Sequence, residues 1–125
     1  MRIEHIAVYV NNLEYAKVFF EKYFNAVAGS KYQNVKTGFS SYFMSFDSGS
    51  RLELMYKKDM CNNENQQQKK FHIAFATKSV EKVNELTSKL KNDGYKVVSG
   101  PRTTGDGYYE SCIEIFDNII IEVTV

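Results

Sequence analysis

A short motif occurs twice in this chain and constrains its fold more than any other feature. His5-Ile6-Ala7 recurs as His72-Ile73-Ala74, displaced by 67 positions. Each copy is followed by a polar break and then by apolar residues at helical spacing. A repeat of this length predicts two copies of one supersecondary unit within 125 residues.

The two halves predict the same order of elements. The first helix is expected to begin near Asn12 and the second near Ser79, because both residue types are good N-caps. The second helix should end at Gly94, which tolerates the left-handed conformation common after a helix. One face of each helix is apolar: Leu13, Ala16, Phe20 and Tyr23 in the first, and Val80, Val83, Leu86 and Leu90 in the second.

Three strand-like segments are expected behind each helix. They cover residues 30–35, 40–46 and 51–56 in the first half and 95–102, 108–116 and 119–125 in the second. Tight turns are predicted at residues 47–50 and near Asp117-Asn118. The fold class is therefore α+β, with two tandem βαβββ modules whose concave sheets surround a cavity.

The modules are predicted to cover residues 1–57 and 71–125, joined by a polar linker over residues 58–70. A half of this size is marginal alone, so the whole chain, residues 1–125, is interpreted as one domain. Sixteen basic and fifteen acidic residues give a net charge of +1. This balance argues against nucleic acid and membrane partners, which require a concentrated positive field.

Cys61 and Cys112 lack the spacing of a CxxC metal motif, which favours a reducing compartment over a disulfide framework. No stretch resembles a targeting segment or a membrane span. We therefore expect a soluble cytoplasmic protein. Cys112 is expected to be a small buried apolar residue, because no histidine lies near it in the sequence.

Each half carries a histidine and a glutamate on strands of apolar character. His5 and His72 are each followed at the second position by alanine, which leaves room above the sheet. Glu53 and Glu122 lie 48 and 50 residues after these histidines, between apolar neighbours. A buried carboxylate is costly unless it is paired or binds a metal. Two imidazoles and two carboxylates would make an N2O2 site for a divalent metal.

Simpler interpretations exist for each residue alone. A single histidine on a strand is more often structural than a metal ligand, and a single glutamate on a strand usually faces solvent. The recurrence of both residues in register across the repeat favours metal binding.

The doubled strand–helix–three-strand plan with these four residues resembles the glyoxalase, bleomycin resistance and extradiol dioxygenase group, the vicinal oxygen chelate superfamily. Residues 3–8 are similar to its first strand, and residues 100–111 are similar to a hairpin of its small bacterial members. The ligand order His, Glu, His, Glu resembles that of small bacterial glyoxalase I-like (lactoylglutathione lyase-like) proteins. One departure is the segment 115–119, where relatives commonly have an Asp-Pro-Asp-Gly-Asn turn.

The resemblance implies conversion of the hemithioacetal of a 2-oxoaldehyde, such as methylglyoxal, to a 2-hydroxyacyl thioester. His5, Glu53, His72 and Glu122 would hold nickel, cobalt or zinc, and glutathione or another thiol would be the co-substrate. Glu122 is the first choice for the catalytic base and Glu53 the second. Metal sites of relatives often form between subunits, so a homodimer is expected.

Arg102, Tyr108 and Tyr109 are candidate substrate residues of the second-half hairpin. Arg102 could pair with a carboxylate of a thiol cofactor. The alternative is that the tyrosines are ordinary strand formers and the arginine a surface residue. For the whole protein, two alternatives stay open. One is a superfamily enzyme with other metal-dependent chemistry (epimerase, thiol transferase or dioxygenase), and the other is a non-catalytic module that binds a small molecule or antibiotic.

Overall fold

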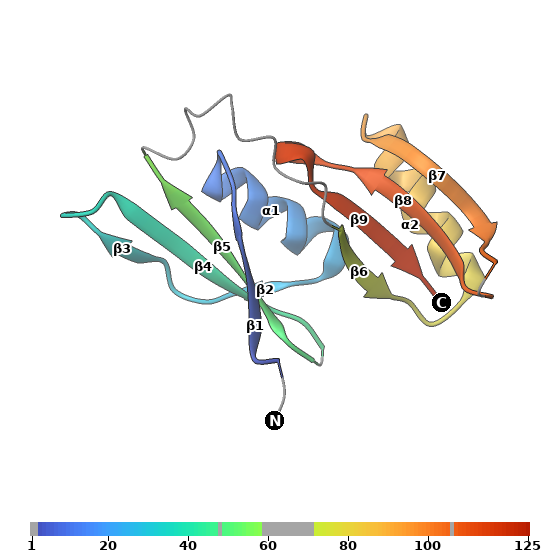
Figure 1. The fold of residues 1–125 in the computed structure, drawn as a ribbon, viewed down its shortest axis with the longest axis horizontal. Helices are drawn as coiled ribbons and strands as arrows, with labels where there is room; N and C mark the ends of the chain where they lie inside the picture. The colour runs from blue at the N-terminus through green and yellow to red at the C-terminus, as the bar shows by residue number, and fades with distance from the viewer. Residues whose placement is uncertain (1–2, 48, 59–71, 106) are drawn as a thin grey trace. The chain divides into compact units, whose positions relative to one another are not determined.

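The computed structural model describes residues 3–47, 49–58, 72–105 and 107–125. The chain divides into two compact units, Met1–Gln66 and Gln67–Val125. Each unit contains a β-sheet with one helix packed against it (Figure 1). This arrangement confirms the predicted α+β fold class with two sheets and two helices.

The first unit places the strand of His5 beside the strand of Glu53. Its sheet has the order β1-β5-β4-β2, with β3 also paired to β4, and only β1 and β5 run parallel. The elements are β1 (His5–Tyr9), α1 (Leu13–Phe24), β2 (Val27–Ala28), β3 (Tyr32–Asn34), β4 (Phe39–Ser45) and β5 (Arg51–Lys57).

The second unit repeats this plan with the strands of His72 and Glu122. Its sheet has the order β6-β9-β8-β7, and β6 runs parallel to β9. The elements are β6 (His72–Ala76), α2 (Val80–Asn92), β7 (Lys96–Thr103), β8 (Tyr109–Glu114), the short 3-10 helix η1 (Phe116–Asn118) and β9 (Ile120–Thr124).

The helix boundaries follow from capping residues, as predicted. The Asn12 side chain accepts a hydrogen bond from the backbone N–H of Tyr15 at 3.0 Å, and Ser79 Oγ accepts one from Lys82 at 3.3 Å. After α2, Gly94 adopts a left-handed conformation with φ of 95°. The β8–β9 connection uses the same region of backbone space, since Asp117 and Asn118 have φ of 56° and 58°. Aspartate and asparagine tolerate this conformation better than most side chains.

The apolar face of α1 is buried, including all four residues predicted from helical spacing. Leu52 and Leu54 of β5 are buried with it, and Glu53 between them points to the opposite face of the sheet. In α2, Val83 and Leu90 are buried as predicted, but Val80 is exposed. Thr87 is the third buried residue of α2.

The strand predicted over residues 30–35 is replaced by two short strands. Ala28 pairs with Met44, and Tyr32 pairs with Ser41. Between these two pairs the chain advances by four residues from β2 to β3 but by only three residues along β4. This extra residue interrupts the ladder, as in a β-bulge, and separates β2 from β3.

Some predicted features lie outside the described residues. Ser48 of the turn at residues 47–50, and residues 59–70 of the proposed linker, including Cys61, belong to this group. In the part of the chain that the structure describes, no helix has the length and apolar character needed to cross a membrane.

Candidate metal centre

His5 and Glu53 lie on the same face of the first sheet, away from α1. In the parallel β1–β5 ladder, Glu53 is the register partner of Ala7, two residues after His5. The small alanine leaves space above the sheet, and His5 Nε2 lies 3.8 Å from Glu53 Oε2. The Glu53 side chain is only 15% exposed, so its carboxylate is largely shielded from water.

The second unit contains the same pair. Glu122 on β9 is the register partner of Ala74, two residues after His72 on β6. His72 Nε2 lies 3.6 Å from Glu122 Oε2, and the Glu122 side chain is 19% exposed. The sequence repeat therefore produces a repeated geometry, with an imidazole nitrogen beside a carboxylate oxygen in each unit.

The other ring nitrogen of His5 is held by Glu4. His5 Nδ1 donates to Glu4 Oε2 at 2.6 Å, and Arg51 Nε donates to Glu4 Oε1 at 2.8 Å. The hydrogen bond from His5, and after it the Arg51 guanidinium, holds the pKa of the Glu4 carboxyl below its ordinary value. With the proton on Nδ1, the lone pair of Nε2 is directed to the Glu53 side.

Phe43 completes the surroundings of His5. It is the register partner of Glu53 on β4, and its ring makes an edge-to-face contact with the imidazole, with centroids 5.1 Å apart. The Arg51 guanidinium lies over the same ring, 4.2 Å from its centroid. Arg51 therefore holds both neighbours of His5 in place: it forms an ion pair with Glu4 and a cation–π contact with Phe43.

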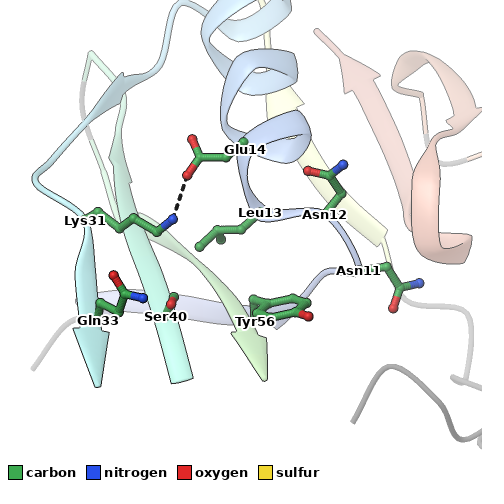
Figure 2. A pocket seen from close by; sticks show the side chains of 8 residues that line it. All are labelled: Asn11, Asn12, Leu13, Glu14, Lys31, Gln33, Ser40 and Tyr56. Atoms are coloured by element: carbon green, nitrogen blue, oxygen red, sulfur yellow. Dashed lines mark hydrogen bonds and ion pairs between the residues drawn. The ribbon is translucent and has the colours of Figure 1, made fainter. Parts of the chain in front are cut away.

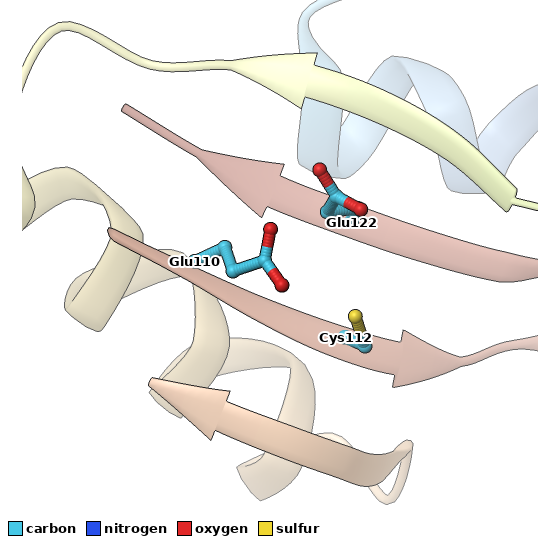
Figure 3. A group of neighbouring side chains, drawn as sticks. All are labelled: Glu110, Cys112 and Glu122. Carbon is cyan, nitrogen blue, oxygen red and sulfur yellow. The ribbon is translucent and has the colours of Figure 1, made fainter. Parts of the chain in front are cut away.

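The second unit has a different set of neighbours around its glutamate. Cys112 on β8 lies directly opposite Glu122 in the antiparallel β8–β9 ladder. Donor atoms of Glu110, Cys112 and Glu122 all lie within 4.8 Å of one another (Figure 3). All three side chains are half-buried. The expectation that Cys112 is a small buried apolar residue is wrong, because the residue is only half-buried and its sulfur lies beside two carboxylates, on the face of the sheet opposite α2.

Each His–Glu pair fits a divalent ion. Metal–nitrogen and metal–oxygen bonds of about 2.0–2.2 Å place two donors on one ion about 3–3.6 Å apart. The 3.6 Å distance in the second unit lies at the edge of this range, and the 3.8 Å distance in the first needs only a small side-chain movement to meet it. Glu4 also supplies the carboxylate partner that metal-binding histidines usually have on their second nitrogen.

The three candidate substrate residues are placed differently. Arg102 on β7 is exposed and is the register partner of Glu110. Tyr108 is exposed at the turn between β7 and β8. Tyr109 donates a hydrogen bond from its hydroxyl to Asn84 Oδ1 of α2 at 2.8 Å. Tyr109 therefore points to the helix side of the sheet, and the structure does not bring it to Glu122.

A pocket of about 340 Å³ lies at the start of α1 (Figure 2). Glu14 and Lys31 cross its edge with a 2.8 Å ion pair, and the Tyr42 hydroxyl donates to the same carboxylate. The remaining lining residues are Asn11, Asn12, Leu13, Gln33, Ser40 and Tyr56. Tyr56 and Ser40 share the helix-facing side of the sheet with Leu54, so this pocket lies on the opposite face from Glu53.

The fold is that of an α+β protein with two strand–helix–strand units, each of which carries a His–Glu pair. The model of the Glyoxalase/Bleomycin resistance protein/Dioxygenase superfamily matches residues 2–122. The chain belongs to this superfamily, which confirms the resemblance noted in the sequence. No curated protein sequence matches the chain.

Several solved structures are similar over nearly the whole chain. A possible glyoxalase from Bacillus cereus is 30% identical, with a TM-score of 0.74, over 100% of this chain and 99% of that one. The trypanothione-dependent glyoxalase I of Leishmania major is 17% identical, with a TM-score of 0.77, over 98% and 85%. The fosfomycin resistance protein FosX of Listeria monocytogenes, solved with Mn(II), is 22% identical, with a TM-score of 0.74, over 98% and 90%. The last two similarities show the fold alone.

Sequence reasoning missed two groups of residues at these sites. The sequence analysis did not predict Glu4 as the hydrogen-bond partner of His5, although the two are chain neighbours, or Arg51 as the partner of Glu4. Cys112 and Glu122 lie five residues on either side of Asp117, within the predicted turn. Counting outward from that turn would have placed the cysteine opposite the glutamate, since directly opposed residues share a face.

Proposed function

We propose that this protein is a metal-dependent isomerase of the glyoxalase I type. Its substrate would be the hemithioacetal of a 2-oxoaldehyde, such as methylglyoxal, with a thiol such as glutathione, and its product a 2-hydroxyacyl thioester. The observation that carries the proposal is the pair of half-buried carboxylates, each within 4 Å of an imidazole nitrogen at equivalent places in the two units.

The proposed ligands of one divalent ion are His5, Glu53, His72 and Glu122, from one chain or from two copies in a homodimer. Imidazole and carboxylate donors suit nickel, cobalt and zinc, and geometry and supply decide between them. When bound, such an ion supplies Lewis-acid polarisation of neighbouring substrate oxygens.

The proton transfer is assigned to a carboxylate of the protein. Glu122 is the proposed base that takes a proton from one substrate carbon and returns it to the next, with Glu53 as the second choice. The side chains of Glu53 and Glu122 are only 15% and 19% exposed, and this shielding strengthens the interaction of their carboxylates with a substrate charge. Arg102 and Tyr108, both exposed near β8, are the proposed contacts for the polar part of the thiol.

Metal content per chain tests the proposed centre. Purified wild-type protein without a histidine tag, reconstituted with nickel, cobalt or zinc, should hold about one ion per chain, as expected for four-coordinate ligation. His5→Ala should lower nickel content and hemithioacetal turnover together. Glu85→Gln on the exposed surface of α2 is the matched control and should change neither.

A Glu122→Gln variant separates catalysis from simple ligand binding. Turnover of the hemithioacetal should fall by about 100-fold or more, the usual contribution of a general base. Stoichiometric metal without any hemithioacetal turnover would reject the glyoxalase I activity, and absence of bound metal in the wild type would reject the centre itself.

Sedimentation of the metal-loaded protein tests the proposed homodimer, and cell fractionation tests the proposed cytoplasmic location.

A further inference from the structure

The second unit carries a group of metal-binding side chains that includes residues outside the proposed centre. Glu110 and Cys112 come from β8 and Glu122 from β9, and Figure 3 shows all three on one side of the two strands. Their donor atoms lie within 4.8 Å of one another. His72 Nε2 lies 3.6 Å from Glu122 Oε2, next to this group but not part of it.

The register of the sheet explains this convergence. Cys112 is opposite Glu122, which in turn is opposite Ala74 on β6, so a small side chain stands between β6 and the group. The ladder also places Thr124 opposite Glu110. Because directly opposed residues share one face of a sheet, the thiol, both carboxylates and the threonine hydroxyl face the same side.

Thr124 provides an independent indication of a missing ligand. Its Oγ1 is buried, and the described part of the chain offers it no hydrogen-bond partner. Buried hydroxyls are nearly always paired, so an unpaired one beside a cluster of donors requires an explanation. A bound cation with a coordinated water would give this hydroxyl an acceptor.

Electrostatics favours a cation at the same place. Two carboxylates held within 4.8 Å of each other and half-buried repel, and a cation between them removes this cost. Arg102 is the register partner of Glu110 but is exposed on β7, on the far side of β8 from Glu122. The side of the group formed by Cys112 and Glu122 therefore has no arginine or lysine as a register neighbour among the described strands.

We propose that the second unit alone binds a thiophilic divalent cation, such as Zn²⁺ or Cd²⁺, through Cys112, Glu122 and Glu110. Thiolate sulfur selects soft ions, whereas the proposed four-residue centre has only nitrogen and oxygen donors. A tetrahedral ion with sulfur and oxygen ligands has donor separations of about 3.3–3.8 Å, so the three donor atoms need to approach one another by at most about 1 Å. The Cys112 thiol loses its proton to solvent when the ion binds.

This site shares Glu122 with the proposed isomerase centre but does not require His5, Glu53 or His72. An ion held by Cys112 therefore withdraws Glu122 from the other centre. The inference does not rest on the proposed function, and it adds a consequence: soft ions should inhibit the isomerase by occupying the sulfur-containing site.

The test uses Cd²⁺ and the full-length protein. Titration of the wild type should produce ultraviolet absorption from sulfur-to-cadmium charge transfer. Cys112→Ser should abolish this absorption and lower Cd²⁺ affinity by about tenfold or more. Cys61→Ser is the matched control and should retain both. His5→Ala should also retain both, although the same variant loses nickel and turnover if the isomerase proposal is right.

A second measurement keeps the test valid if Cys112→Ser does not fold. In the Cys61→Ser background the remaining thiol is Cys112, and Cd²⁺ should protect it from alkylation by iodoacetamide. Absence of the charge-transfer absorption in the wild type, its persistence in Cys112→Ser, or its loss in His5→Ala would overturn the inference. Loss of nickel-dependent turnover in His5→Ala with retained Cd²⁺–sulfur absorption separates failure of one site from failure of the other.

Discussion

Glu4 Oε2 lies 2.6 Å from His5 Nδ1, so two neighbours in the sequence form a directed carboxylate–imidazole pair. The backbone N–H of Arg51 donates to the Glu4 carbonyl at 3.0 Å, and the Arg51 side chain binds the Glu4 carboxylate. These contacts fix the segment before β1 to the start of β5. They leave His5 Nε2 on the side of Glu53, which is the orientation that metal binding requires.

Substitution of Glu4 should weaken metal binding in a graded way. Glu4→Ala removes the acceptor from His5 and should lower divalent-metal affinity by about 10–100-fold, the usual effect of losing such a partner. Glu4→Gln retains an oxygen acceptor but loses the charge that binds Arg51, so its affinity should be intermediate. Competition titration with a chelating dye measures both.

If Glu4 acts by positioning His5, excess metal should restore the activity of the Glu4 variants. Turnover of the Glu4 variants should recover when the metal concentration is raised well above the new Kd, because Glu4 does not contact the substrate in this proposal. Glu85→Gln, on the exposed face of α2, should bind metal like the wild type. Equal affinities for Glu4→Ala and the wild type would show that His5 does not depend on this hydrogen bond.

Gly100 should tolerate no side chain. Its φ is 78°, and a Cβ placed there would lie 2.4 Å from the Glu110 carbonyl oxygen and 2.9 Å from Ser111 Cα. Both atoms belong to the backbone of β8 and cannot move without disturbing the sheet. Gly100→Ala should therefore destabilise the protein by about 2–3 kcal/mol, from backbone strain and overpacking together.

Gly105 is the matched control for this substitution. A Cβ at Gly105 meets no atom within 4 Å. Gly105→Ala should change the free energy of unfolding by no more than about 0.5 kcal/mol, as is usual for surface substitutions. Urea denaturation of the three proteins measures the difference, and equal midpoints for both variants would contradict the predicted contact between Gly100 and β8.

The buried hydroxyl pair beneath α2 gives another test. Thr87 Oγ1 donates a hydrogen bond to the Val83 carbonyl at 2.6 Å and lies 2.6 Å from Ser111 Oγ. Thr87→Val keeps the shape but leaves the Ser111 hydroxyl buried without this partner, which should cost about 1–3 kcal/mol. The double variant with Ser111→Ala should recover part of that loss, and a double-mutant cycle measures the coupling. Ser88→Ala, exposed on the same helix, is the control, and strict additivity would show that the two hydroxyls do not interact.

The repeat was sufficient to predict most of the fold. Local rules determine where the helices begin, because Asn12 and Ser79 satisfy backbone donors that the helix cannot. Contacts with the rest of the fold determine features that these local rules do not predict. Thr87 takes a buried position in α2 because Ser111 on the facing strand supplies a hydrogen-bond partner, and a periodicity of apolar residues contains no sign of it.

The same distinction applies to the candidate sites. The repeated spacing of 48 and 50 residues indicated that the two His–Glu pairs occupy equivalent places. The proximity of each histidine to its glutamate comes from the parallel pairing between the first and last strands of a module, which the spacing did not predict. Glu4 lies outside β1, so strand alternation gives no information on its direction. Cys112 was assessed by its neighbours in the sequence, whereas its chemical neighbours lie across the β8–β9 ladder.

The Glu14–Lys31 ion pair should produce a small dependence of stability on acid pH. The hydrogen bond from Lys31, and after it that from Tyr42, holds the pKa of the Glu14 carboxyl below its ordinary value. A carboxyl whose pKa is lowered by folding stabilises the folded state above its unfolded pKa of about 4.3, and this contribution disappears as the pH falls through the lower folded value. Because the Glu14 side chain is 56% exposed, the contribution should stay below about 1 kcal/mol and decrease at high salt.

Lys31→Gln should raise the pKa of Glu14 in an NMR titration and flatten the loss of stability below about pH 4. Lys91→Gln in the last turn of α2 serves as the control, and an unchanged Glu14 titration in Lys31→Gln would show that the ion pair does not set this pKa.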